Sequence, residues 1–112
     1  MQSSAITKQR RTRALDLLTD TRLFKEFAYI DGAWQASGSG RCIAVTDPGS
    51  GDWIGQVPAM SAAESSVAIA AAERAFPAWA ALLPQQRAQF LRRWFEQIVA
   101  NREDLALLMT LE

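Results

Sequence analysis

The sequence of 112 residues contains no histidine and a single cysteine, Cys42. Without histidine the chain has no imidazole general base, no Ser-His-Asp or Cys-His pair and no imidazole metal ligand. One cysteine cannot form an internal disulfide or a thiolate zinc site, and this cysteine usage is typical of a reducing compartment. We therefore expect a cytoplasmic protein whose chain carries no histidine-dependent or disulfide chemistry.

The sequence also lacks an excess of charge and a long apolar run. Twelve basic and twelve acidic side chains give a formal net charge of zero, so no overall basic field attracts nucleic acid or an acidic membrane surface. The longest apolar runs, residues 67–72 and 78–83, are far shorter than the roughly 20 residues that span a bilayer. We expect no nucleic-acid partner, no membrane partner and at most one modest domain.

Acidic residues are scarce in the first 22 residues, which are basic and rich in hydroxyl groups. A transit peptide has this composition, and a nucleic-acid or partner-binding arm is a further alternative. The favoured interpretation is an N-terminal extension over residues 1–22 that is poorly ordered, or docked as a short helix through Leu15 and Leu18.

Between residues 27 and 57 the pattern predicts two short β-hairpins. Asp31-Gly32 favours the positive φ values of a two-residue hairpin turn, and residues 47–51 form the second turn. Residues 37–40, Ser-Gly-Ser-Gly, are expected to be a flexible connector with nothing to pack against. The expected strands are residues 27–30, 33–35, 42–46 and 53–57.

Three helices are predicted after residue 60, so the expected fold class is α+β, two hairpins followed by three helices. Ser61 and Glu64 have the spacing of a capping box, and Pro77 is expected to end or kink the first helix. Pro84 suits the first turn of the second helix, and Asn101 is expected to cap the third. We expect the first two helices to pack on each other as a pair. The expected buried stripes are Ile69, Ala72, Phe76 and Trp79, then Ala88, Leu91, Phe95 and Ile98, then Leu105, Leu108, Met109 and Leu111.

No motif in the chain is predicted to carry catalysis, to bind a cofactor or to bind a metal. The glycine run 49–55 resembles half of a dinucleotide fingerprint, but its spacing is wrong and a strand follows where a helix is required. Cys42 has no adjacent base and is expected to be a small packing residue or an edge thiol. Glu103 and Asp104 are most simply acids that favour a helix start.

Several segments share their order and spacing with one known family. They are Tyr29-Ile30-Asp31-Gly32-Ala33-Trp34, Val45-Thr46-Asp47-Pro48, Ile54-Gly55-Gln56-Val57-Pro58, Phe76-Pro77-Ala78-Trp79, Leu91-Arg92-Arg93-Trp94-Phe95 and Leu108-Met109-Thr110-Leu111-Glu112. On these segments, residues 23–112 resemble the N-terminal part of the aldehyde dehydrogenase superfamily, most closely its succinate-semialdehyde dehydrogenase branch.

The resemblance implies a several-fold longer homo-oligomeric enzyme with a Rossmann-like α/β coenzyme domain, which oxidises succinate semialdehyde to succinate with NAD or NADP. In such enzymes a cysteine thiolate attacks the aldehyde, hydride passes to the nicotinamide, and a glutamate activates water. An asparagine amide and the amide of that cysteine form the oxyanion hole. In the family, the motifs that carry this cysteine, this glutamate and this asparagine all follow the position of Glu112. Cys42 therefore inherits no catalytic role.

The helical pattern that starts at residue 101 runs to Glu112 without a glycine cap, a basic last turn or a proline. We expect an incomplete coenzyme-binding domain over residues 23–112, inactive by itself. The alternative is a self-standing α+β interaction module that binds a protein partner through its hairpins and the stripe 105–111.

Overall fold

The computed structural model describes residues 12–112 and shows two small antiparallel sheets and three α-helices, which confirms the α+β class. Two 3₁₀ helices precede the first strand. The elements are η1 Arg13–Leu17, η2 Thr21–Leu23, β1 Ala28–Ile30, β2 Ala33–Gln35, β3 Cys42–Thr46, β4 Trp53–Pro58, α1 Ala62–Ala81, α2 Pro84–Ala100 and α3 Arg102–Leu111. Each strand lies within one residue of its predicted bounds.

The first hairpin pairs β1 with β2 across a two-residue turn. Asp31 and Gly32 have φ values of 51° and 79°, and two positive φ values match the right-handed twist of the flanking strands. Tyr29 is opposite Trp34, with the ring centroids 5.1 Å apart. The predicted hairpin and its turn are therefore confirmed.

The second hairpin pairs β3 with β4, and its turn is organised by Asp47. One carboxylate oxygen of Asp47 accepts from the Gly49 amide at 2.8 Å and the other from the Ser50 hydroxyl at 3.0 Å. These donors, the Gly49 amide foremost, lower the pKa of Asp47. The glycine run is therefore a turn between strands, as predicted. Gly55, in β4, is a glycine for a different reason. A Cβ at this position would lie only 2.6 Å from Cζ of Phe24.

One carboxylate, Glu64, both caps α1 and holds the connector between the hairpins. Its Oε2 accepts from the Ser61 amide at 2.7 Å, while the Glu64 amide donates to the Ser61 hydroxyl at 3.2 Å, so the predicted capping box is confirmed. Its Oε1 accepts from the Gly38 amide at 2.6 Å, and Ser37 is buried. The Gly38 amide, then the Ser61 donors, lower the pKa of Glu64. The prediction of an unpacked flexible connector is wrong here.

Pro77 does not end α1, which continues to Ala81. A proline removes one helical hydrogen bond, and the alanine-rich turns on both sides have high helix propensity. The helix ends instead at Leu82 and Leu83, which adopt extended ψ angles of 145° and 148°. Pro84 disfavours helical geometry at the residue before it, and it occupies the first position of α2 as predicted.

Asn101 lies between α2 and α3, but its side chain does not cap α3. Its Nδ2 donates to the Gln97 carbonyl at 2.8 Å, and its backbone amide donates to the same oxygen at 3.1 Å. The side chain of Asn101 therefore adds a second donor to a carbonyl in the last turn of α2 that its own backbone amide already pairs. The predicted side-chain cap is wrong, because the amide group is oriented with Nδ2 toward Gln97 and its oxygen, the acceptor that an N-cap uses, bonds no amide of α3.

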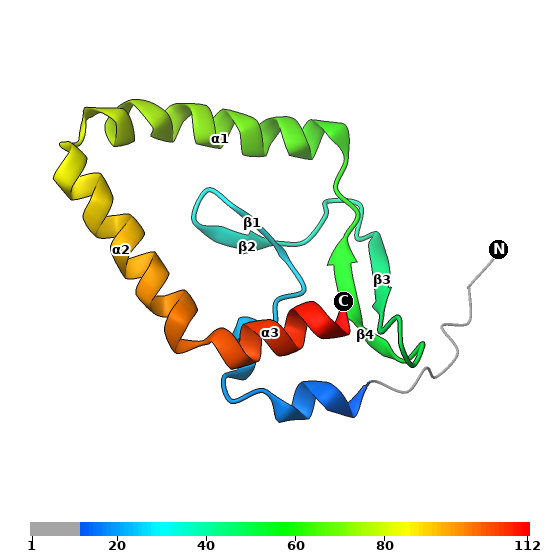
Figure 1. Cartoon of the computed structure of the whole chain (residues 1–112). Helices are drawn as coiled ribbons and strands as arrows, with labels where there is room; N and C mark the ends of the chain where they lie inside the picture. Colours follow the sequence, from blue (N-terminus) through cyan, green and yellow to red (C-terminus); the bar gives the residue numbers. More distant parts are fainter. Residues whose placement is uncertain (1–11) are drawn as a thin grey trace.

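The elements form an open frame (Figure 1). In that view α1 runs along the top, α2 along the left, α3 along the bottom and the β3–β4 hairpin along the right, with the β1–β2 hairpin inside. The Cα radius of gyration is 17.7 Å, against about 13 Å for a compact chain of this length. α1 and α2 diverge from their corner, where Trp79 and Phe90 have ring centroids 5.8 Å apart. The predicted helical pair is therefore wrong.

The buried apolar cluster lies where the N-terminal segment, β4 and the end of α3 meet. It comprises Leu15, Leu18, Ile54 and Leu111, and Ile54 is only 1% exposed. Residues 12–22 are thus docked through Leu15 and Leu18, the second form expected for the extension, whereas residues 1–11 lie outside the described residues.

The predicted helix stripes are mostly not covered. Only Leu111 is fully buried, and Leu105 and Leu108 are half-buried. The helices carry apolar residues at the expected spacing, but the open frame brings no surface against them. The exposed stripe members are Ile69, Ala72, Phe76, Trp79, Ala88, Leu91, Phe95, Ile98 and Met109.

Candidate functional site

Cys42 begins β3, opposite Pro58, and its thiol is exposed. The sulfur lies 3.9 Å from the Gly40 carbonyl oxygen, a weak contact. Of the two interpretations from sequence, the structure shows the edge thiol rather than the packing residue. Within residues 12–112, no group of three or more Cys, Asp and Glu side chains could hold a metal ion.

The two features that could hold the pyrophosphate of a nicotinamide dinucleotide do not fit it. The amide of Gly49 already donates to Asp47 in a turn between strands. The start of α1 is closed by the carboxylate of Glu64, which bonds the Ser61 amide at 2.7 Å. A negative charge there opposes a phosphate at a helix start. These residues therefore offer the coenzyme no cradle.

The most organised polar cluster joins α3 to the N-terminal segment. The two carboxylate oxygens of Asp104 accept from the amides of Thr19, at 2.9 Å, and Asp20, at 2.8 Å. Asp104 is only 7% exposed, and these two donors, Thr19 first, lower its pKa. Arg22 hydrogen-bonds both carboxylate oxygens of Asp20 and lowers the pKa of that group to about 2.

Sequence reasoning missed this role, since Asp104 was interpreted only as an acid that favours a helix start. Its partners lie 84 and 85 positions earlier in the chain. Both are backbone amides, which every residue except proline carries. No side-chain pattern in the sequence could therefore have identified the pair.

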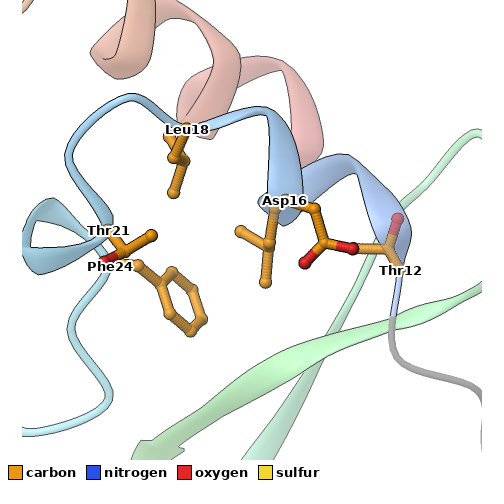
Figure 2. Close-up of a pocket in the computed structure, with 6 residues that line it drawn as sticks. Thr12, Asp16, Leu18, Thr21 and Phe24 are labelled. Carbon is orange, nitrogen blue, oxygen red and sulfur yellow. The ribbon is translucent and has the colours of Figure 1, made fainter.

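Two of the cavities next to these elements differ clearly in their linings. The smaller, of about 230 Å³, is lined by Thr12, Leu15, Asp16, Leu18, Thr21 and Phe24 of the N-terminal segment, and Figure 2 shows it. The larger is an open apolar groove of about 520 Å³ along α3. Its lining consists of Ile98, Arg102, Leu105, Ala106, Leu108, Met109 and Glu112. The lining of the larger groove is mostly apolar, which is typical of a packing surface.

Among the helices of residues 12–112, none combines the length and apolar character needed to cross a membrane. Many of the exposed large apolar side chains project from α1 and α2. They include Val67, Ile69, Phe76, Phe90, Leu91, Trp94, Phe95 and Val99.

Comparison with known proteins gives a consistent match. A model of the aldehyde dehydrogenase family matches residues 34–112. The chain is 50% identical over 95 residues to the glutarate-semialdehyde dehydrogenase of Pseudomonas aeruginosa and 48% identical to the NADP-dependent succinate-semialdehyde dehydrogenase of Escherichia coli. Each match covers 85% of this chain and 20% of the relative, so the chain spans about a fifth of their length.

Solved structures agree with the sequence match. An NADP-dependent enzyme of Escherichia coli superposes with a TM-score of 0.83 at 48% identity. The succinate-semialdehyde dehydrogenase of Burkholderia pseudomallei superposes with a TM-score of 0.82 at 43% identity. Each covers 85% of this chain and 20% of the other. Because sequence and structure agree over most of its length, this chain belongs to the aldehyde dehydrogenase family.

Proposed function

We propose that this chain is the N-terminal part of an NAD(P)-dependent aldehyde dehydrogenase that oxidises succinate semialdehyde to succinate. The full-length protein would be a cytoplasmic homo-oligomer with a Rossmann-like coenzyme domain. In this proposal residues 23–112 form the outer strands and first helices of that domain, and the reacting groups lie beyond Glu112. The 48% identity to an enzyme named for succinate semialdehyde and NADP supports the substrate and coenzyme class.

The observation that carries this proposal is the open frame with uncovered apolar helices. Phe76, Leu91 and Phe95 are each more than half exposed, and apolar surface on this scale is unfavourable in water. A catalytic segment several times longer would cover it, which fits the fifth of each relative that this chain spans. The role of this chain is then to support the coenzyme domain from outside.

The substrate class rests on what most of the relatives' names share, since one of them, from Pseudomonas putida, is named for 3-sulfolactaldehyde, which carries a sulfonate instead of a carboxylate. Glutarate, succinate and aspartate semialdehydes all carry a carboxylate at the end away from the aldehyde. A site that pairs such a carboxylate with fixed donors discriminates strongly against aldehydes that lack it. We therefore propose a semialdehyde with a terminal carboxylate, and succinate semialdehyde as its preferred member.

Turnover of the protein encoded by the complete reading frame tests this proposal. We expect reduction of NAD or NADP with succinate semialdehyde, slower reduction with glutarate semialdehyde, and least with an aliphatic aldehyde of equal length. The 112-residue chain, purified alone, should reduce neither coenzyme. Turnover by that chain that survives Cys42→Ser and removal of host enzymes would contradict the proposed position of the reacting groups.

The interaction-module alternative makes a different prediction about the gene. A stop codon directly after the Glu112 codon in independent clones would favour that module, whereas an open frame that continues with family motifs supports the dehydrogenase. A full-length protein that reduces neither coenzyme with any semialdehyde would overturn the proposal.

Replacing Cys42 by serine in the full-length protein should leave kcat within about twofold of wild type, because the thiol is exposed at a strand edge and has no adjacent base. The matched control is serine at the cysteine of the downstream family motif, where turnover should be lost. Steady-state rates, compared at equal amounts of folded protein, measure both. A large loss with Cys42→Ser alone would show that the nucleophile lies in this segment.

A further inference from the structure

The N-terminal segment 12–23 is attached to the rest of the chain by hydrogen bonds near its two ends. At the first end the Thr12 amide donates to the Trp53 carbonyl of β4 at 2.8 Å. At the other, the Thr19 and Asp20 amides donate to Asp104 of α3 at 2.9 and 2.8 Å. The segment therefore bridges β4 and α3, two elements about 50 residues apart in sequence.

Between these ends the segment is held by two apolar side chains rather than by regular hydrogen bonding. Its helical turns are 3₁₀ in type, which have poorer hydrogen-bond geometry than α-helical turns. A partly open pocket of about 230 Å³ lies along it between Thr12 and Phe24 (Figure 2), so this side of the segment is not covered by the other described parts of the chain. Leu15 and Leu18 are its buried apolar anchors.

The chain directly after the segment is fixed separately. The Glu26 carboxylate accepts from the Gln56 amide at 3.0 Å, and Phe24 lies against Gly55, where a Cβ would come within 2.6 Å of the ring. Arg22 is paired with Asp20 inside the segment rather than with the body. A movement of residues 12–23 would therefore pivot at residues 24–26 and leave the β3–β4 hairpin in place.

From this arrangement we propose that residues 12–23 are a releasable strap, held closed by the carboxylate of Asp104, over the apolar cluster of Ile54 and Leu111. At this end of the strap one carboxylate, that of Asp104, accepts the hydrogen bonds of both the Thr19 and the Asp20 amides. Its release removes Leu15 and Leu18 from Ile54 and uncovers that cluster. The strap thus gives the fold a local opening that does not require the hairpins or α1 and α2 to unfold.

Asp104→Asn tests the strap directly. An amide side chain offers one acceptor oxygen and places an NH₂ group where the second backbone amide must donate. In the full-length protein we expect the Thr19 and Asp20 amides to exchange hydrogen about tenfold faster, since charge-assisted hydrogen bonds to a buried acceptor are among the stronger ones. Trypsin cleavage after Arg13 should accelerate to a similar extent.

The matched control is Glu103→Gln, which neutralises the neighbouring exposed carboxylate that pairs with Arg102. It should leave both readouts within about twofold of wild type. The Gln56 amide, held by Glu26 beyond the pivot, is the internal reference and should be unchanged in both variants. Unprotected Thr19 and Asp20 amides in the wild-type chain would overturn the proposal, as would equal loss of protection at Gln56 in Asp104→Asn.

The pH dependence gives a second readout. The folded pKa of Asp104 is below the ordinary value of 3.8. The stabilisation that its carboxylate gives to the closed strap is therefore fully present above that value and is lost as pH falls through the folded pKa. The charged groups around it are Asp20 with its partner Arg22, and Arg102 and Glu103 on α3. In wild type, protection of the Thr19 and Asp20 amides from hydrogen exchange should fall when the pH drops below about 4. This fall should be absent in Asp104→Asn. A pH profile identical in both would contradict the role of Asp104.

Discussion

The isolated 112-residue chain is expected to self-associate and to unfold without one steep transition. Its frame leaves the apolar residues of α1 and α2 in water, and the buried cluster of four side chains found within residues 12–112 lies at a single corner. Such a cluster cannot couple elements that do not touch it, so the tryptophans of the hairpins and helices should report different transitions. Exposed apolar surface of this kind promotes association between copies.

Sedimentation at several protein concentrations and urea unfolding, followed by tryptophan fluorescence and far-ultraviolet circular dichroism, measure this. We expect species larger than a monomer that increase with concentration, and fluorescence and circular dichroism midpoints that do not coincide. Co-expression with the remainder of the full-length protein should suppress the association. A monomer with one coincident steep transition would mean that these residues fold as a complete domain, and the interaction-module alternative would then be favoured.

Ile54→Ala should abolish the packed corner. Ile54 is the most buried large side chain among the described residues, and truncating a buried isoleucine to alanine costs ~2–5 kcal/mol through lost transfer energy and a residual cavity. The matched control is Ile43→Ala on the paired strand β3, where the side chain is 58% exposed. That change should cost less than about 0.5 kcal/mol.

Hydrogen exchange at Thr12 measures the difference, because its amide donates to the carbonyl of Trp53, next to Ile54. With Ile54→Ala we expect exchange to accelerate about 100-fold, or to reach the rate of an unprotected amide, since every 1.4 kcal/mol is a factor of ten. With Ile43→Ala the rate should change less than about threefold. Equal effects of the two substitutions would show that the corner is not the centre of packing.

The turn of the first hairpin and the starts of α1 and α2 could be predicted, because in each case the interacting residues lie within four positions of each other in the sequence. Asp31-Gly32 adopts positive φ values in the hairpin, and the hydroxyl of Ser61 meets the amide of Glu64. The ring of Pro84 begins α2. Propensity and short-range hydrogen bonding suffice for such features.

The candidate site was less accessible from sequence. The sequence shows directly that the chain has no histidine. The turn at residues 47–51 could be predicted from its glycines and from the strand that comes after it. The prediction that this chain carries no catalytic residue stays a prediction. Asp104 gave no distinguishing signal, because an acid in the first turn of a helix is favoured whether or not it has a distant partner.

The sequence by itself determined the order of the strands and helices and the bounds of the strands, and its motifs pointed to the aldehyde dehydrogenase family. Only the tertiary structure decided that Glu64 also binds Gly38, that Asp104 holds the N-terminal segment, and that the stripe containing Phe76 faces water. The physical reason is the range of each interaction. Periodicity shows which face of a helix is apolar, but what covers that face, and which distant backbone amide meets a carboxylate, depends on how the elements are placed in space.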